Sequence, residues 1–361
     1  FAATDANAVL EDYFEHIRVV PEDAPPAPTG WCSWYYYFTK ITARDMDENL
    51  GVAKEKGVAW EFFQLDDGYQ TAVGDWLSLN AKFPEGLKPL VDRITAAGMK
   101  AGIWFAPFSA RANSRLFREH PDWFLTDVAG RPYKVGWNPM WGLGGTFHGL
   151  DTTHPEVQAY LRKVTHTFVH EWGFQYLKLD FVYSASVYAT ARDPRLSPAE
   201  RLSLGFRIVR EAAGPDVFIL GCGAPLAPSL GHVDGMRIGP DVAPYWFPTL
   251  RYHLTRDPHA LSTLFAIRSM LTRAQMHRRL WQNDPDCLLI RDTETRLTAS
   301  ERDTLLNAIL ITGSMLLLSD RLSRLKDAFW PRIAEIARLI RDCGRGRTLP
   351  LDLMEREIPE I

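Results

Sequence analysis

The sequence predicts an α/β protein of the (β/α)8 TIM barrel class. Short apolar runs alternate with segments whose apolar residues recur at helical spacing. Seven or eight such strand-then-helix units follow one another without a series of hairpins, and this pattern is typical of a parallel sheet. So many units favour a closed barrel over an open sheet, and a length of 361 residues suits a barrel with insertions.

Composition and charge exclude several classes of protein. The net charge of -3 gives no basic footprint for nucleic acid, and no apolar run reaches the ~18 residues of a membrane span. The four cysteines lie far apart without CxxC pairs, which favours free thiols in a reducing compartment. We therefore expect a cytoplasmic protein, and a leader lost upstream of Phe1 stays open as an alternative.

The chain is expected to have three parts. Residues 1–28 form an N-terminal helix and a Pro-rich linker, residues 29–341 form the barrel, and residues 342–361 form a tail that leads out of it. In the first part of the barrel, Thr42 with Asp45 begins a helix that Gly57 ends. A loop-rich insertion with several tryptophans then runs to about residue 151. The elements expected before it are strands over 30–37, 60–65 and 100–107, and helices over 42–57 and 87–98.

The middle of the chain carries the clearest helical signal. Thr153 and Glu156 make a capping box, apolar residues recur at helical spacing, and Gly173 ends the helix. A strand over 175–181 follows, in which alternate side chains, including Lys178 and Asp180, share one face. The elements expected after it are helices over 197–214, 250–279 and from 298, strands over 216–222, 234–238 and 314–318, a turn over 281–286, and a last helix over 333–340.

Polar or aromatic side chains stand at the end of strand after strand. One aspartate after a strand is usually a helix cap or a turn residue, but that explanation does not suit the whole set. In a βα barrel these strand ends gather on one rim, which carries the active site. The residues are Trp34, Asp66, Asp67, Trp104, Lys178, Asp180, Cys222, Arg237, Asp241 and Asp284.

Two carboxylates on one rim are the equipment for glycoside hydrolysis. We expect Asp180 to be the nucleophile, held ionised by Lys178, although a structural ion pair is the competing explanation. The charge of Asp180 would then favour a protonated Asp241 as acid/base, and Arg237 would orient Asp241 or bind a sugar hydroxyl. No cofactor or metal is expected, because His166 and the histidine four residues later lack a third ligand and no phosphate-binding loop occurs.

The chain resembles the catalytic barrel of the α-galactosidases of glycoside hydrolase family 36, which share a clan with family 27. The resemblance runs from about residue 30 to 320, and its blocks occur in the order of the family. They are Gly30-Trp31-Cys32-Ser33-Trp34, Asp66-Asp67-Gly68-Tyr69-Gln70, Gly74-Asp75-Trp76, Lys82-Phe83-Pro84-Glu85-Gly86-Leu87, Gly102-Ile103-Trp104-Phe105, His120-Pro121-Asp122-Trp123, Leu150-Asp151 with Pro155-Glu156-Val157, Lys178-Leu179-Asp180, Arg237-Ile238-Gly239-Pro240-Asp241 and Asn283-Asp284-Pro285-Asp286.

The resemblance implies a retaining exo-α-galactosidase that releases terminal α-linked galactose by double displacement. Its nucleophile would be Asp180 and its acid/base Asp241. Asp66 and Asp67 would hold the galactose 4- and 6-hydroxyls. Other residues that the resemblance places around the sugar are Trp34, Trp104, Lys178 and Cys222. The implied partner is a small α-galactoside, with no nucleic acid or membrane, and a homo-oligomer is left open.

The chain also departs from the family pattern. Phe181-Val182 stands where many members carry Met-Asn, Ala106-Pro107-Phe108 replaces a Glu-Pro-Glu-type run, and Gly223-Ala224 begins a changed loop. These departures keep open a galactosyl transferase of the raffinose-synthase type or an α-N-acetylgalactosaminidase on the same barrel. The flanking β domains of the family are absent from the sequence, so a sugar-binding barrel without catalysis is a third hypothesis.

Overall fold

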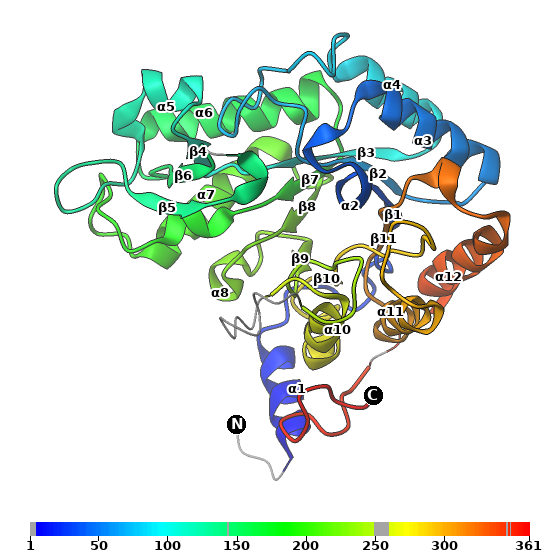
Figure 1. Cartoon of the computed structure of the whole chain (residues 1–361). Helices are drawn as coiled ribbons and strands as arrows, with labels where there is room; N and C mark the ends of the chain where they lie inside the picture. The colour runs from blue at the N-terminus through cyan, green and yellow to red at the C-terminus, as the bar shows by residue number, and fades with distance from the viewer. Residues whose placement is uncertain (1–4, 143, 249–259, 344–345, 347) are drawn as a thin grey trace. The chain divides into compact units, whose positions relative to one another are not determined.

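The computed structural model describes residues 5–142, 144–248, 260–343, 346 and 348–361 (Figure 1). The chain divides into two compact units that interleave along the sequence. The boundaries of the first unit are Phe1–Tyr36, Glu48–Phe63 and Gly235–Ile361, and those of the second are Tyr37–Asp47 and Gln64–Asp234.

Eight strands form one sheet. They are β1 (Thr29–Cys32), β2 (Phe62–Leu65), β3 (Lys100–Phe105), β7 (Tyr176–Leu179), β8 (Phe218–Gly221), β9 (Gly235–Arg237), β10 (Gln282–Asp284) and β11 (Leu316–Leu318). Their order is β10-β9-β8-β7-β3-β2-β1-β11. In the second unit β7 pairs in parallel with β3 and β8, and in the first unit β1 pairs with β11 and β9 with β10, again in parallel.

The two ends of this order meet within the first unit. The backbone N–H of Met315, just before β11, donates to the carbonyl of Asn283 in β10 at 2.9 Å. Leu288 and Leu318 then form a parallel bridge. Eight strands, parallel pairing and this contact between the ends confirm the predicted (β/α)8 barrel.

The helices follow the strands along the chain, as the sequence predicts. They are α1 (Ala6–His16), α2 (Trp34–Tyr37), α3 (Ala43–Lys56), α4 (Lys88–Ala96), α5 (Arg115–Glu119), α6 (Pro155–His166), α7 (Pro198–Ala213), α8 (Leu226–Ser229), α10 (Thr263–Thr272), α11 (Ala299–Thr312) and α12 (Trp330–Cys343). Ser197 with Glu200 and Thr298 with Glu301 form complete capping boxes. In the described part of the chain, none of these helices has the length and apolar character to cross a membrane.

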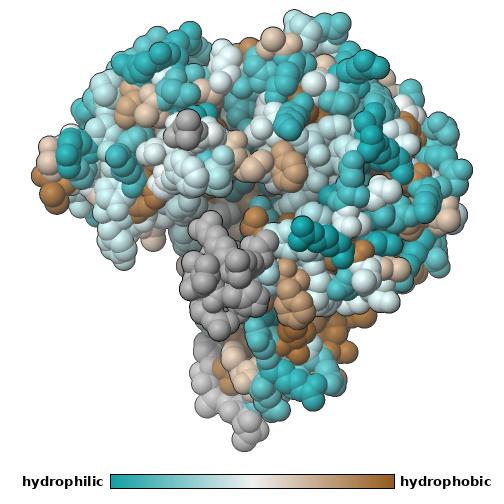
Figure 2. Space-filling view, in the orientation of Figure 1, coloured by the Kyte–Doolittle hydropathy of each residue, from teal (hydrophilic) through white to brown (hydrophobic). Residues whose placement is uncertain are grey.

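Large apolar side chains fill the core of each unit. In the first unit the ring of Trp31 stacks on Phe63 with their centroids 4.5 Å apart. In the second unit Phe105 meets Phe168 edge to face at 5.1 Å, and both are fully buried. On the face drawn in Figure 2, hydrophilic residues predominate, and hydrophobic ones form smaller groups among them.

The segment between β3 and α6 carries a sheet of its own, which corrects the expectation of a loop-rich insertion. Strands β4 (Ser109–Arg111), β5 (Lys134–Trp137) and β6 (Thr146–Gly149) pair antiparallel in the order β4-β6-β5. Strands of three or four residues are too short to show an alternating pattern, and β5 has a bulge in its register. We call these three strands the inserted sheet.

The predicted strand over 30–37 ends at Cys32, and α2 begins at Trp34. The cause is the side chain of Ser319, whose hydroxyl donates to the carbonyl of Cys32 at 2.8 Å and accepts from the N–H of Tyr35 at 2.9 Å. Because a side chain takes these backbone bonds, the strand ends there and Tyr35 enters a helical turn.

The predicted capping box at Thr153 is also wrong. The N-cap of α6 is His154, whose ring nitrogen Nδ1 accepts from the N–H of Glu156 at 3.2 Å. The hydroxyl of Thr153 donates to Asp151 at 2.7 Å, and Glu156 accepts from the indole of Trp123 at 2.9 Å. Tertiary partners therefore occupy both side chains of the expected box.

Two expectations in the last third need correction. The expected turn over 281–286 contains the buried strand β10, whose polar side chains find partners: the Asn283 amide donates to the carbonyl of Arg273 at 2.9 Å. Of the helix expected over 250–279, residues 250–259 lie outside the described residues, and α10 covers residues 263–272.

Candidate active site

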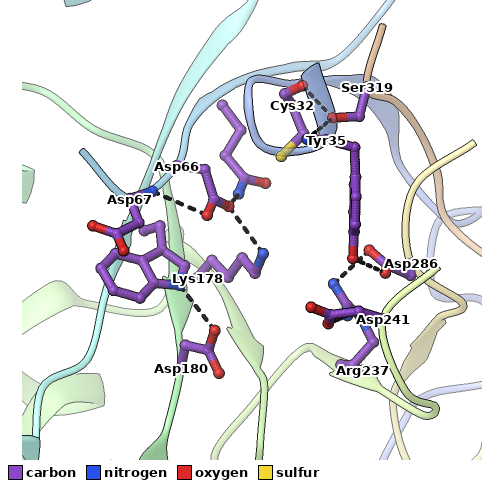
Figure 3. A network of polar contacts seen from close by, with 12 residues as sticks. Cys32, Tyr35, Asp66, Asp67, Lys178, Asp180, Arg237, Asp241, Asp286 and Ser319 are labelled. Carbon is purple, nitrogen blue, oxygen red and sulfur yellow. Dashed lines mark hydrogen bonds and ion pairs between the residues drawn. The ribbon is translucent and has the colours of Figure 1, made fainter. Parts of the chain in front are cut away.

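In the second unit, polar side chains from the carboxyl ends of three neighbouring strands lie together (Figure 3). Asp66 and Asp67 directly follow β2, Trp104 lies near the end of β3, and Lys178 and Asp180 come from the end of β7. Strand ends on this side of a βα barrel carry the active site.

Asp66 is the most heavily bonded carboxylate of this group. Its Oδ2 accepts from Lys178 Nζ at 2.9 Å and from the side-chain amide of Gln64 at 2.6 Å, and its Oδ1 accepts from the N–H of Asp67 at 3.0 Å. Lys178 and Asp66 are both buried. The sequence predicted that Lys178 would stabilise Asp180, whereas its ion pair in the structure is with Asp66. Ion pairing and hydrogen bonds offset the desolvation of these two charges.

Asp180 is held by uncharged donors on both oxygens. The indole nitrogen of Trp104 donates to Oδ2 at 2.9 Å, and the N–H of Phe181 donates to Oδ1 at 2.7 Å. Phe181 adopts a left-handed conformation with φ 50°, which turns the chain sharply after the carboxylate. Asp180 is only half-buried. Its carboxylate is therefore fixed in direction while part of it stays open to a ligand.

Asp67 has the most perturbed carboxyl group of this set. Burial raises its pKa to about 6, and the negative charges of Asp66 and Asp180 add to this. Hydrogen bonds from the Gln70 amide at 2.7 Å and the Trp141 indole at 2.8 Å act in the opposite direction. Trp141, which follows β5 of the inserted sheet, is a residue that the sequence analysis missed.

The remaining predicted binding residues are placed as follows. Cys222 is a buried cysteine outside any disulfide, directly after β8, and its N–H donates to the carbonyl of Leu179 at 2.8 Å. The next residue, Gly223, has φ 53°, and a side chain there would place its Cβ 3.3 Å from Oδ1 of Asp180. Trp34 belongs to the first unit, where it lies half-buried in the first turn of α2.

In the first unit, Arg237 at the end of β9 gathers three carboxylates. Its Nη1 donates to Asp241 at 2.9 Å, its Nε donates to Asp284 at 3.2 Å, and its Nη2 lies 2.6 Å from Asp286. Asp284 and Asp286 are buried, whereas the side chain of Asp241 is 43% exposed. The sequence predicts that Arg237 lies beside Asp241, and the structure brings the two side chains together.

Asp286 has a further partner that the sequence analysis gave no role. The hydroxyl of Tyr35 donates to its Oδ2 (Figure 3). Burial and the charges of Asp241 and Asp286 raise the pKa of Tyr35 well above its ordinary value, so the phenol keeps its proton. Tyr35 directly follows the block Gly30-Trp31-Cys32-Ser33-Trp34, but no spacing rule links it to a residue so far along the chain.

The histidine pair considered for a metal does lie together. The rings of His166 and His170 are 4.8 Å apart, and Nε2 of His170 bonds to the carbonyl of Ala212 at 3.0 Å. Among the residues that the structure describes, no group of three or more His, Cys, Asp or Glu side chains is arranged to hold a metal ion.

Comparison with proteins of known sequence gives relatives that include a galactosaminidase and an α-galactosidase. A galactosaminidase of Flavonifractor plautii, named for α-D-galactosamine of A type blood, is 30% identical over 235 residues, which cover 59% of this chain and 21% of that protein. The α-galactosidase AgaA of Geobacillus stearothermophilus is 28% identical over 200 residues, 52% of this chain and 26% of AgaA. The chain thus spans about a fifth to a quarter of the length of these two relatives.

Solved structures agree with this comparison. The α-galactosidase TtGalA of Thermus thermophilus, solved with p-nitrophenyl α-D-galactopyranoside, superposes with a TM-score of 0.81 at 35% identity. The match covers 92% of this chain and 65% of TtGalA. It supports the barrel as the shared fold.

The family model described as Melibiase matches residues 19–206, which is more than half of the chain. This range contains β1, β2, β3 and β7, and with them Asp66, Asp67, Lys178 and Asp180. The resemblance to the family 36 α-galactosidases that the sequence motifs indicate is therefore confirmed, and the chain belongs to the Melibiase family.

Proposed function

We propose that the chain is the catalytic barrel of a retaining exo-α-galactosidase. The observation that carries this proposal is the group of Asp66, Asp67, Trp104, Lys178 and Asp180 at the carboxyl ends of β2, β3 and β7. In this group Asp180 is a partly exposed carboxylate. The carboxylates of Asp66 and Asp67 and the ammonium group of Lys178 can form hydrogen bonds with sugar hydroxyls. TtGalA, which was solved with a nitrophenyl galactoside and with stachyose, is the similar structure that supports the substrate class.

Asp180 is the proposed nucleophile. One of its carboxylate oxygens attacks C1 of the terminal galactose, and the bond from C1 to the leaving oxygen breaks to give a galactosyl-enzyme ester. The indole of Trp104 and the N–H of Phe181 fix the carboxylate for this attack. Because both donors are uncharged, they orient the carboxylate without neutralising it.

Asp241 is the proposed acid/base. It gives its proton to the leaving oxygen in the first step, and in the second step it takes a proton from the water that attacks C1. Asp66 and Asp67 would accept hydrogen bonds from galactose hydroxyls, and Lys178 would donate to one. Two successive inversions at C1 return the α configuration.

The first experiment compares the wild-type chain with Asp180→Ala and Asp241→Ala on 4-nitrophenyl α-galactoside. Asp180→Ala should lose nearly all turnover, on the order of 10⁴-fold or more, because no covalent intermediate can form. Azide should restore activity to Asp241→Ala by attacking the galactosyl-enzyme and releasing α-galactosyl azide. Wild-type activity in Asp180→Ala would refute the assignment.

A second experiment tests the stereochemistry. Proton NMR of the first product should show α-galactose before mutarotation, and a galactose-bound crystal structure should place the two carboxyl groups ~5–5.5 Å apart. Initial release of β-galactose would mean inversion and would contradict a double displacement.

A second candidate is hydrolysis of an amino or N-acetylamino galactoside. The relative from Flavonifractor plautii favours it, since its name gives galactosamine as its substrate. Parallel assays with the nitrophenyl α-glycosides of galactose, galactosamine and N-acetylgalactosamine rank these donors by kcat/KM. Addition of sucrose to the galactoside assay tests the transferase alternative, in which a trisaccharide would appear at the expense of free galactose.

A further inference from the structure

We propose that Asp286 and Tyr35 are positioning residues for Asp241, and that they act on it through Arg237 and through the backbone of Val242. The proposal rests on the proposed function, because it takes Asp241 as the acid/base. It adds two residues to the site that are buried and that would not themselves touch the sugar.

The first support is how the guanidinium of Arg237 is shared. Its Nη2 lies 2.6 Å from Asp286 and its Nε donates to Asp284, and both carboxylates are almost fully buried. A planar guanidinium presents its donors in a fixed fork, so two buried partners set the plane of the group. Nη1 is then directed at the partly exposed Asp241 at 2.9 Å. Arg237 thereby transmits the position of Asp286 to Asp241.

A second contact reaches the same place by another route. Oδ2 of Asp286 accepts from the N–H of Val242 at 2.7 Å. Val242 directly follows Asp241 in the chain. Asp286 therefore fixes both the guanidinium that contacts the side chain of Asp241 and the peptide bond that carries Asp241.

Tyr35 completes this arrangement. Its phenol donates to the Oδ2 that Val242 also uses, while Oδ1 faces Arg237. Oδ2 of Asp286 thus accepts two hydrogen bonds while Oδ1 lies in ion-pair contact with Arg237, and contacts on both oxygens set the orientation of the carboxylate. The backbone of Asp286 adopts φ 82°, which is unfavourable for a residue other than glycine and persists only where surrounding contacts hold it.

These contacts lead to an expectation for acid catalysis in particular. A displaced Asp241 would protonate the leaving oxygen poorly, and this matters most when the leaving group is a poor one. A dinitrophenolate leaves without a proton, whereas the alkoxide of methyl α-galactoside does not. The decrease in kcat/KM caused by replacing Asp286 or Tyr35 should therefore depend on the leaving group. The same dependence is expected when the acid/base itself is replaced.

The experiment measures kcat/KM of Asp286→Asn and Tyr35→Phe on 2,4-dinitrophenyl and methyl α-galactosides. For Asp286→Asn we expect a loss with the methyl glycoside that is at least tenfold greater than the loss with the dinitrophenyl glycoside. Tyr35→Phe should also lose more kcat/KM with the methyl glycoside than with the dinitrophenyl glycoside. The difference should be smaller, because this variant removes only one of the donors to Asp286. Azide should partly rescue the dinitrophenyl reaction of Asp286→Asn.

The matched control is Asp320→Asn. Asp320 is a fully buried carboxylate of the same unit that pairs with Arg291 at 2.6 Å and accepts two backbone N–H bonds. Its loss should lower stability and reduce activity on both substrates by the same factor. If Asp286→Asn, like this control, loses activity by the same factor on both substrates, the proposal is overturned.

The proposed function and this inference fail in different ways. If Asp241→Ala shows no dependence on the leaving group, Asp241 is not the acid and the proposed function fails. If Asp241→Ala shows the dependence and neither Asp286→Asn nor Tyr35→Phe does, the inference alone is wrong. Should Asp286→Asn not fold, Tyr35→Phe decides, since it removes a single hydroxyl.

Discussion

At Asp67, opposing forces act on a single buried carboxyl. Burial, with the charges of Asp66 and Asp180, raises its pKa to about 6, and the donors on Gln70 and Trp141 limit this rise. A carboxyl with a raised pKa in the folded state stabilises the fold most at pH values below its ordinary pKa. That contribution is lost as the pH rises through about 6. Under the proposed function, sugar binding would have the opposite pH dependence, because the ionised carboxylate of Asp67 accepts hydrogen bonds from hydroxyls on both of its oxygens.

We therefore expect kcat/KM for a nitrophenyl α-galactoside to fall below pH ~6 as Asp67 takes up a proton. Trp141→Phe removes one of the donors that favour the carboxylate. A hydrogen bond to a charged group contributes about 1.5–3 kcal/mol, so the acidic limb of the pH profile should move up by roughly one to two pH units. The pH profile of kcat/KM measures this shift.

The control for this prediction is Trp137→Phe, which changes an exposed tryptophan of β5 in the same inserted sheet. Its profile should match that of the wild type. If the acidic limb of the kcat/KM profile of Trp141→Phe lies at the same pH as in the wild type, Trp141 does not influence the protonation of Asp67.

At the scale of elements, local signals were predictable and long-range ones were not. The helix expected from residue 197 is confirmed, and its capping box is local because Glu200 lies three residues after Ser197. The box at Thr153 failed because Asp151 takes the hydroxyl, and Trp141 was missed because its partner Asp67 is 74 residues distant. The strand ends around Asp180 were predictable because the barrel class itself places them together.

The connection after β8 allows a test at this scale. Gly223 and Gly231 both have positive φ, 53° and 77°, so alanine strains either position by about 1 kcal/mol. At Gly223 the new Cβ would also lie 3.3 Å from Oδ1 of Asp180, whereas at Gly231 nothing lies within 4 Å. Both variants should have slightly lower melting temperatures than the wild type. Only Gly223→Ala should also lower kcat, by roughly tenfold, which corresponds to a rise of about 1.4 kcal/mol in the activation barrier.

Melting temperatures and steady-state kinetics of the two alanine variants provide the measurement. Equal kcat values for Gly223→Ala and Gly231→Ala would show that the loop after β8 does not constrain Asp180.

At the scale of the whole molecule, the fold depends on a sheet whose last strand is buried. Leu317 in β11 is 3% exposed, and its side chain packs against Gly30. A side chain at Gly30 would place Cβ only 2.3 Å from the carbonyl oxygen of Phe62, so this part of the first unit requires a glycine. Packing therefore accounts for the glycine at the start of the block Gly30-Trp31-Cys32-Ser33-Trp34.

Leu317→Ala should lower the free energy of unfolding by about 2–5 kcal/mol, because it leaves a cavity beside β1. Ile311→Ala, on the 53% exposed Ile311 of α11, should change it by less than about 1 kcal/mol. Urea unfolding followed by tryptophan fluorescence compares the two. Similar losses in both variants would mean that the centre of this sheet is not tightly packed.

The inserted sheet also bears on the candidate site. Its three antiparallel strands are confined to one connection, between β3 and α6, yet Trp141 from this connection contacts Asp67. Under the proposed function, substitutions in this connection would change how Asp67 binds a sugar hydroxyl, although none of the eight strands of the large sheet lies in it.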